Sequence, residues 1–132
     1  MNFLVTGGSG YLGSSIIKFI KNKKQNVLNL DTNSNNQIDT IKADVLNYEM
    51  LKSIFINNKI DVVIHNIAKV PITKNKKDFY EVNVLGTKNI IELSKKFKIK
   101  KFIFISSSAV YGIPNHLPIT EKSKKIPVEP YG

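Results

Sequence analysis

Apolar residues occur along this chain in short runs and in helical stripes that follow one another in alternation. Short apolar runs predict strands that begin at residue 2 and that span residues 26–31, 38–43, 60–65 and 101–106. Apolar residues three or four positions apart predict helices over residues 14–21, from an N-cap at Asn47 to residues 57–58, and over residues 78–97. Such alternation predicts a parallel sheet with right-handed crossovers. We therefore expect an α/β fold, a Rossmann-type doubly wound sheet with the strand order 3-2-1-4-5.

Three glycines, Gly7, Gly10 and Gly13, stand between the first predicted strand and the first predicted helix. Gly7 allows the chain to turn sharply, Gly10 lets a pyrophosphate approach the backbone, and Gly13 lets the helix pack close to the sheet. Amide groups at the start of the helix then face the phosphates, whose negative charge the helix dipole favours. A glycine turn in this context predicts a dinucleotide-binding site, with an ordinary tight turn as the alternative.

An acidic residue at the end of the second predicted strand bears on the choice of cofactor. Asp31 stands where a carboxylate accepts hydrogen bonds from the adenosine ribose hydroxyls. This carboxylate would repel a 2′-phosphate, and the neighbouring Thr32 and Asn33 carry no compensating positive charge. The sequence therefore predicts NAD rather than NADP as the cofactor.

Composition limits the classes of function. A chain of 132 residues fits one domain, residues 1–132. It contains no cysteine, which excludes disulfides and thiolate chemistry, and no apolar run that could cross a bilayer. Because the first strand begins at residue 2, we expect no signal peptide and a cytoplasmic protein. The net charge of +10 comes from lysines without a single arginine, the preferred reader of guanine and phosphate, so nucleic-acid binding is not predicted.

Six motifs, in order along the chain, resemble those of the extended short-chain dehydrogenase/reductase family, in particular its NAD-dependent epimerase/dehydratase group. They are residues 6–13, Asp44 with Val45, residues 65–68, residues 82–87, residues 106–112, and Glu121 with residues 127–132. The resemblance covers essentially the whole chain. One departure is that the family more often has two alanines where Ile67 and Ala68 stand.

The resemblance implies a set of residues that contact NAD. Asn83 is similar to a helix asparagine that helps to hold the loop after the fourth strand, and His65 is interpreted as a structural residue at a strand end. The full set of implied cofactor-binding residues is Gly7, Gly10, Tyr11, Leu12, Gly13, Asp31, Asp44, Val45, Ala68 and Asn83.

The resemblance also implies two catalytic residues. Ser107 lies four residues before Tyr111, where the family's substrate-polarising serine or threonine stands, although Ser106 and Ser108 remain alternatives and backbone capping would also explain a serine run. Tyr131 would be the general acid/base. The serine and the tyrosine would contact one substrate oxygen while the attached carbon gives hydride to NAD, which epimerases and dehydratases later return. Nucleotide-linked sugars are the implied substrates.

The 132 residues depart from the family's Tyr-x-x-x-Lys motif because no lysine follows Tyr131. That lysine would lower the phenol pKa from about 10 and hold the nicotinamide ribose. We therefore expect a truncated N-terminal NAD-binding part that is inactive alone, with an exposed apolar patch on the fourth and fifth strands. One alternative is a non-catalytic NAD-binding or regulatory module that needs a completing subunit or a homodimer. Another is an NAD(P)-dependent ketone or aldehyde reductase of the same family, which residues 70–71 and 78–80 would also fit.

Overall fold

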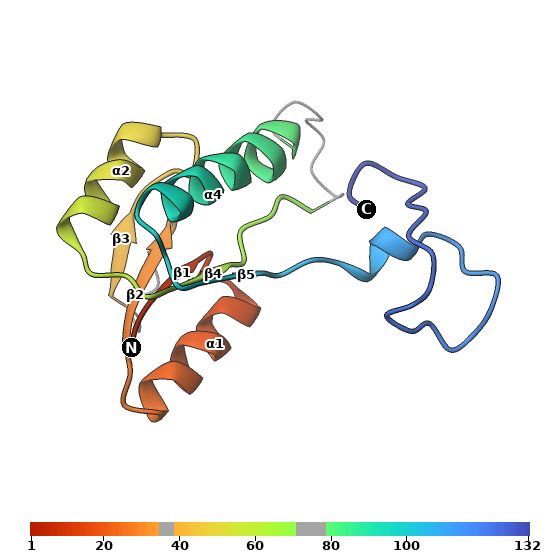
Figure 1. The fold of residues 1–132 in the computed structure, drawn as a ribbon, viewed down its shortest axis with the longest axis horizontal. Helices are drawn as coiled ribbons and strands as arrows, with labels where there is room; N and C mark the ends of the chain where they lie inside the picture. Colours follow the sequence, from red (N-terminus) through yellow and green to blue (C-terminus); the bar gives the residue numbers. More distant parts are fainter. Residues whose placement is uncertain (35–38, 71–78) are drawn as a thin grey trace.

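The computed structural model describes residues 1–34, 39–70 and 79–132 (Figure 1). Its strands form one parallel sheet in the order β3-β2-β1-β4-β5, which confirms the predicted Rossmann-type arrangement. The carboxyl ends of β1 and β4 lie side by side, with Thr6 opposite His65. The strands are β1 (Asn2–Thr6), β2 (Asn26–Asp31), β3 (Thr40–Lys42), β4 (Val62–His65) and β5 (Lys101–Phe104).

Helices cover both faces of the sheet (Figure 1). Helix α1 (Tyr11–Asn22) lies on one face, and α2 (Tyr48–Asn57) and α4 (Thr87–Lys96) lie on the other. Because side chains alternate along a strand, the strands β1, β2 and β4 supply both layers of the core. In β1, Leu4 packs in the cluster that contains α2 and α4 residues, whereas the next residue, Val5, packs against Ile17 and Ile20 of α1.

The predicted elements are close to the observed ones at most positions. Strand β2 has the predicted bounds, whereas β4 begins at Val62 and β5 ends at Phe104, so that both are shorter than predicted. The side chain of Asn47 caps α2 by accepting a hydrogen bond from the Met50 N–H, as expected. Helix α1 begins at Tyr11, three residues earlier than predicted. Residue 38, the predicted start of the third strand, lies outside the described residues.

The prediction of one α-helix over residues 78–97 is wrong in its first half. Residue 78 lies outside the described residues, and Glu81–Gly86 form a π-helix, η1, that leads directly into α4. Gly86 ends this turn and packs closely, because a Cβ there would stand 2.5 Å from Val45 Cγ2. A π-helical turn is rare and is found frequently at functional sites.

One expectation about exposed apolar side chains is corrected, and one position departs from the helical stripe. Leu12 falls on the apolar stripe of α1 but is 46% exposed, because Gly13, Ile17 and Ile20 form the buried face of the helix. The apolar patch predicted on the fourth and fifth strands is limited to β5, where Phe104 is 52% exposed, since β4 is buried along its whole length. Among the described helices, none has the length and apolar character to cross a bilayer.

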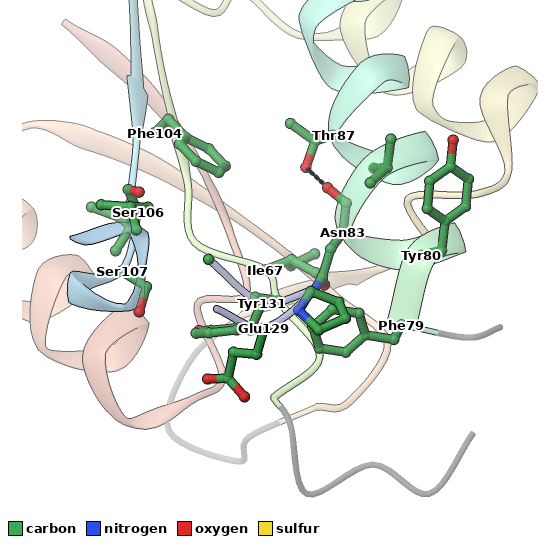
Figure 2. Close-up of a pocket in the computed structure, with 16 residues that line it drawn as sticks. Ile67, Phe79, Tyr80, Asn83, Thr87, Phe104, Ser106, Ser107, Glu129 and Tyr131 are labelled. Carbon is green, nitrogen blue, oxygen red and sulfur yellow. Dashed lines mark hydrogen bonds between the residues drawn. The ribbon is translucent and has the colours of Figure 1, made fainter. Parts of the chain in front are cut away.

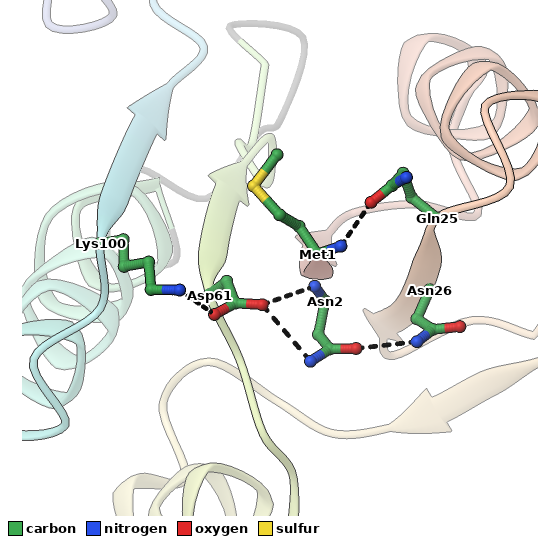
Figure 3. A network of polar contacts seen from close by, with 6 residues as sticks. All are labelled: Met1, Asn2, Gln25, Asn26, Asp61 and Lys100. Carbon is green, nitrogen blue, oxygen red and sulfur yellow. Dashed lines mark hydrogen bonds and ion pairs between the residues drawn. The ribbon is translucent and has the colours of Figure 1, made fainter.

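Polar contacts join the amino ends of the strands (Figure 3). Asp61, just before β4, accepts a hydrogen bond from the Asn2 N–H at 2.9 Å and pairs with Lys100 Nζ at 2.9 Å. The hydrogen bond from Lys100, followed by that from Asn2, lowers the pKa of Asp61 below its ordinary value. Asn26 donates in turn to Asn2, and the terminal amine of Met1 donates to Gln25. These contacts join β1, β2, β4 and β5 at the end of the sheet opposite the glycine turn.

Candidate functional site

The turn after β1 is built by close backbone approaches. Gly7 has a positive φ of 72° and donates its N–H to the Leu30 carbonyl at 2.8 Å, which attaches the turn to β2. Gly10 donates to the Gly7 carbonyl at 3.2 Å. A Cβ on Gly13 would stand 2.2 Å from the Gly7 carbonyl oxygen, so this glycine packs the helix against the turn itself. The turn therefore places the start of α1 directly at the carboxyl end of β1.

Space remains around Gly10, the N-cap residue of α1. The nearest atom to a Cβ there would be the Gly7 carbonyl oxygen at 3.4 Å, an ordinary contact. Gly10 has extended backbone and no side chain that could cap the helix. Tyr11 is 96% exposed and Leu12 is half-exposed. The first N–H groups of a helix lack partners within it, so this end of α1 offers open donors to an anion.

Asp31 lies beside the turn and is nearly buried. Its Oδ2 accepts a hydrogen bond from the Ser9 N–H at 3.0 Å, and its Oδ1 accepts one from the Asn33 N–H at 3.0 Å. An ionised carboxylate has about four acceptor sites, so acceptor capacity remains on both oxygens. The arrangement can receive hydroxyl groups, as the sequence predicted for this residue.

Of the predicted pair, Asp44 is exposed and Val45 is buried. The Asp44 carboxylate is at the surface and accepts from the Leu46 N–H at 2.9 Å. Val45 is 2% exposed, with its side chain in the core against Gly86, while its carbonyl accepts from Asn89. Of this pair, Asp44 alone therefore presents its side chain to a ligand.

Asn83 lies in η1 and is hydrogen-bonded to the loop after β4. Its Oδ1 accepts from the Lys69 N–H at 2.7 Å, and its Nδ2 donates to the Lys69 carbonyl at 2.9 Å. These two bonds satisfy both backbone groups of Lys69. The contact is the one that the family resemblance implied for this asparagine, and it fixes the segment that contains Ala68.

A buried chain of hydrogen bonds runs from the end of β1 through β4 to η1. Asn66 N–H and Thr6 Oγ1 are 3.1 Å apart, and Thr6 Oγ1 lies 2.8 Å from His65 Nδ1. On the other side of the ring, His65 Nε2 lies 2.9 Å from Thr87 Oγ1. Thr87 donates its proton to the Asn83 carbonyl at 2.7 Å, the bond drawn in Figure 2.

The direction of these bonds fixes the protonation of His65. Because the Thr87 hydroxyl donates to Asn83, it accepts from His65, which requires a proton on Nε2. His65 Nδ1 then accepts from the Thr6 hydroxyl and carries no proton. Burial lowers the pKa of His65 to about 4, which agrees with a neutral ring. The histidine is fully buried and stacks on Phe104 with the ring centroids 5.9 Å apart.

A cavity of about 550 Å³ opens at the carboxyl ends of β4 and β5. Ser106 and Ser107 stand on one side of it, and Phe79, Tyr80 and Asn83 stand on the other (Figure 2). The cavity brings together four of the predicted site residues, although these come from widely separated parts of the sequence. They are Ala68, Asn83, Ser107 and Tyr131.

Backbone contacts bring the last residues to the segment after β5. Ser107 accepts a hydrogen bond from the Ala109 N–H at 3.2 Å and thereby caps the short 3₁₀ helix η2 (Ser108–Tyr111). A Cβ on Gly132 would stand 2.4 Å from the Ala109 carbonyl oxygen, so the chain end packs on this helix. Tyr131 consequently lies in the cavity, with its ring 5.9 Å from that of Phe79. Ser106 and Ser107 line the cavity, whereas Ser108 is absent from its described lining.

Some residues of the site were not identified from the sequence. Thr87 lies one helical turn after Asn83, and Thr6 is the last residue of β1; these positions could have indicated a polar contact. Ser9, inside the glycine turn, binds both Asp31 and Asn33. Glu129 also lines the cavity. The contacts of Thr6 with His65 and of Ser9 with Asp31 join segments that are separate in the sequence, so local spacing does not predict them.

Known proteins resemble this chain in sequence and in fold. The model of the NAD dependent epimerase/dehydratase family matches residues 3–132. The chain is 33% identical to a UDP-glucose 4-epimerase from Halalkalibacterium halodurans, with 100% of the chain and 42% of the relative covered. It is 38% identical to a putative UDP-glucose 4-epimerase from Methanocaldococcus jannaschii, with 98% of the chain and 46% of the relative covered.

A solved structure shows the same fold. It is that of UDP-glucose 4-epimerase from Bifidobacterium longum in complex with NAD+ and UDP, which matches with a TM-score of 0.87 at 29% identity and covers 95% of this chain and 42% of that one. The chain therefore spans less than half the length of these relatives.

Proposed function

Since the chain belongs to the NAD dependent epimerase/dehydratase family, we propose that it is the N-terminal, NAD-binding part of an epimerase/dehydratase-type oxidoreductase that acts on nucleotide-linked sugars. The observation that carries the proposal is the open backbone at Gly10, beside a carboxylate on Asp31 with acceptor capacity to spare. The NAD+ and UDP in the Bifidobacterium longum relative support both the cofactor and the substrate class.

In this proposal each part of NAD meets a different group of residues. Gly10 and the N–H groups that follow it at the start of α1 would hold the pyrophosphate. Asp31 accepts from the adenosine ribose hydroxyls, and its negative charge disfavours the 2′-phosphate of NADP. Asp44 would contact the adenine with its exposed carboxylate, and the segment with Ala68, which Asn83 holds, would contact the nicotinamide end.

The cavity at β4 and β5 would receive the reacting part of the sugar. NAD, when bound, accepts hydride from the substrate carbon and returns it. Ser107 accepts the Ala109 N–H with its oxygen, so its own proton stays available for the substrate oxygen. Tyr131 would take and return the proton of the same oxygen. Since no lysine follows Tyr131 in the 132 residues, we expect these residues alone to bind NAD without turnover.

The test is NAD binding by calorimetry with wild-type protein and the variant Gly10→Ala. Gly10 has φ −77° and free space, so alanine should leave the melting temperature nearly unchanged. The new methyl group would stand where the pyrophosphate approaches, and we expect the affinity for NAD to fall at least tenfold. Ser15→Ala, which adds no atoms on the exposed side of the same helix, is the matched control.

Two results would contradict the proposal. The first is a folded wild-type protein that binds neither NAD nor NADP. The second is a Gly10→Ala variant that binds NAD as tightly as the wild type. A wild-type preference for NADP would leave dinucleotide binding intact and refute the role of Asp31.

A further inference from the structure

Asn29 is a polar residue at a position where the strand pattern calls for an apolar one. It lies in β2 between Leu28 and Leu30, and it is 1% exposed. On the face of the sheet that α1 covers, its side chain reaches the glycine turn. A Cβ on Gly8 would stand 2.2 Å from Asn29 Oδ1 and 2.3 Å from Ile17 Cδ1. The amide therefore occupies space that an apolar side chain could have filled.

The Asn29 amide group uses both of its N–H donors to join separate segments. Nδ2 donates to Thr40 Oγ1 of β3 at 2.8 Å and to Ser9 Oγ of the glycine turn at 3.1 Å. Ser9 in turn donates its hydroxyl proton to the Asn33 carbonyl at 2.8 Å. Its backbone N–H binds the Asp31 carboxylate. Three residues of one segment, Asn29, Asp31 and Asn33, thus fix Ser9.

The cost of burying Asn29 argues against a role in stability alone. Its Oδ1 is buried and accepts no hydrogen bond from the described residues. A buried, unsatisfied carbonyl is destabilising, whereas an apolar residue of similar shape would avoid this penalty. Natural proteins retain such locally unfavourable choices at functional sites. The benefit must therefore lie in what the amide holds, which is the turn that contains Gly10.

We propose that Asn29 is a positioning residue for the dinucleotide: its hydrogen bond to Ser9 holds the glycine turn and the Asp31 carboxylate in the geometry that receives the adenosine end of NAD. This inference rests on the proposed NAD binding. It adds a residue outside the glycine motif, acting through Ser9 rather than by contact with the cofactor. A turn fixed before binding loses less conformational freedom when NAD binds, and affinity rises accordingly.

The experiment is a double-mutant cycle on NAD binding with Asn29→Leu, Ser9→Ala and the double variant. Each single change removes the same bond, so we expect each to weaken NAD binding about five- to tenfold. Because the residues act through one another, the double variant should lose no more than either single one. Asn29→Leu should also melt at or above the wild-type temperature, a result that a purely structural role would not give. Asn26→Ala, at the exposed amino end of β2, is the matched control and should bind NAD normally.

Each of the other possible results would decide whether Asn29 positions the glycine turn. Single variants with wild-type affinity, or losses that multiply in the double variant, would overturn the inference while leaving NAD binding by the wild type intact. If Asn29→Leu does not fold, Ser9→Ala tests the same bond from a half-buried turn, and its affinity alone decides. A wild-type protein that binds no NAD would instead refute the proposed function, and the inference with it.

Discussion

The buried histidine allows a prediction about pH that can be worked from the structure. His65 is neutral in the folded protein, with Nδ1 accepting from Thr6 and Nε2 donating to Thr87. Protonation would add an N–H at Nδ1. This N–H would face the Thr6 hydroxyl, which donates its proton to Nδ1 in the neutral form. Burial also opposes the charge and lowers the pKa of His65 from 6.5 to about 4. The experiment lowers the pH from 7.5 to 5 and compares the stability of the wild-type protein with that of the His65→Gln variant.

The magnitude follows from proton linkage. Between pH 6.5 and 4 the unfolded chain binds a proton at His65 and the folded chain does not, so stability falls as the pH falls. With these two pKa values the free energy of unfolding should decrease by about 2 kcal/mol between pH 7.5 and pH 5. Glutamine does not titrate, so the His65→Gln variant should not show this part of the decrease in stability. At pH 7.5 the variant should be less stable by about 1–3 kcal/mol, because one side-chain end cannot reach both threonines.

The assay is urea unfolding at half-unit steps of pH, followed by circular dichroism. His116→Gln is the matched control, since His116 is the second histidine of the chain and is exposed. This control should retain the pH dependence of the wild type. Nitrogen chemical shifts of His65 should independently show a proton on Nε2 and none on Nδ1.

Two results would refute the reasoning about His65. One is an equal dependence of stability on pH in wild type and His65→Gln, which would mean that the ring titrates alike in the folded and unfolded chains. The other is a proton on Nδ1 at neutral pH. The hydrogen bonds with Thr6 and Thr87 would then run in the opposite direction, and the Asn83 carbonyl would need another donor.

The remaining predictions concern packing and the amino ends of the strands. Gly13→Ala should destabilise the fold by about 3 kcal/mol in urea unfolding, because its methyl group meets backbone at 2.2 Å; unchanged stability would show that the turn can move. Gly86→Ala should cost about 1–2 kcal/mol, and its effect should shrink in a Val45→Ala background, since the clash is with that side chain; additive effects would argue against this contact. Asp61→Asn should lower the melting temperature more than Lys100→Ala, because Lys100 is 72% exposed whereas the carboxylate also binds the Asn2 N–H; the reverse order would assign the stabilisation to the ion pair.

Local chemistry made part of this structure predictable. The alternation of strands and helices gave the sheet order, and the N-cap at Asn47 followed from its own side chain. The bonds of Asn83 to the loop after β4 were predicted from the family resemblance. Each of these features depends on residues near one another in sequence, or on a motif with a known partner.

Other features depend on contacts that no local pattern records. The π-helical turn at Glu81–Gly86 ends at a glycine that packs against Val45, a residue about 40 positions away. Leu12 is exposed because Gly13 takes the position nearest the turn. The direction of the bonds around His65 is set by Thr87, which belongs to another element. Hydrophobic periodicity and secondary-structure propensity describe one segment at a time, so they cannot predict these contacts between segments.

Buried and half-buried polar side chains gather at the carboxyl ends of the strands, beside the loops that follow them. Backbone groups in such loops must find partners, and side chains from rigid elements can supply them. Asn29 binds Ser9, His65 binds Thr6 and Thr87, and Asn83 binds the backbone of Lys69; each bond joins a regular element to the segment beside the proposed NAD site. The two apolar clusters lie on the faces of the sheet and meet some of these polar side chains, since Phe102 contacts both the first cluster and the His65 ring. The His65 bonds should therefore affect stability directly, as argued above. The bond of Asn29 to Ser9 and the bonds of Asn83 to Lys69 should chiefly change the affinity for NAD, while changes in the apolar clusters should chiefly move the melting temperature.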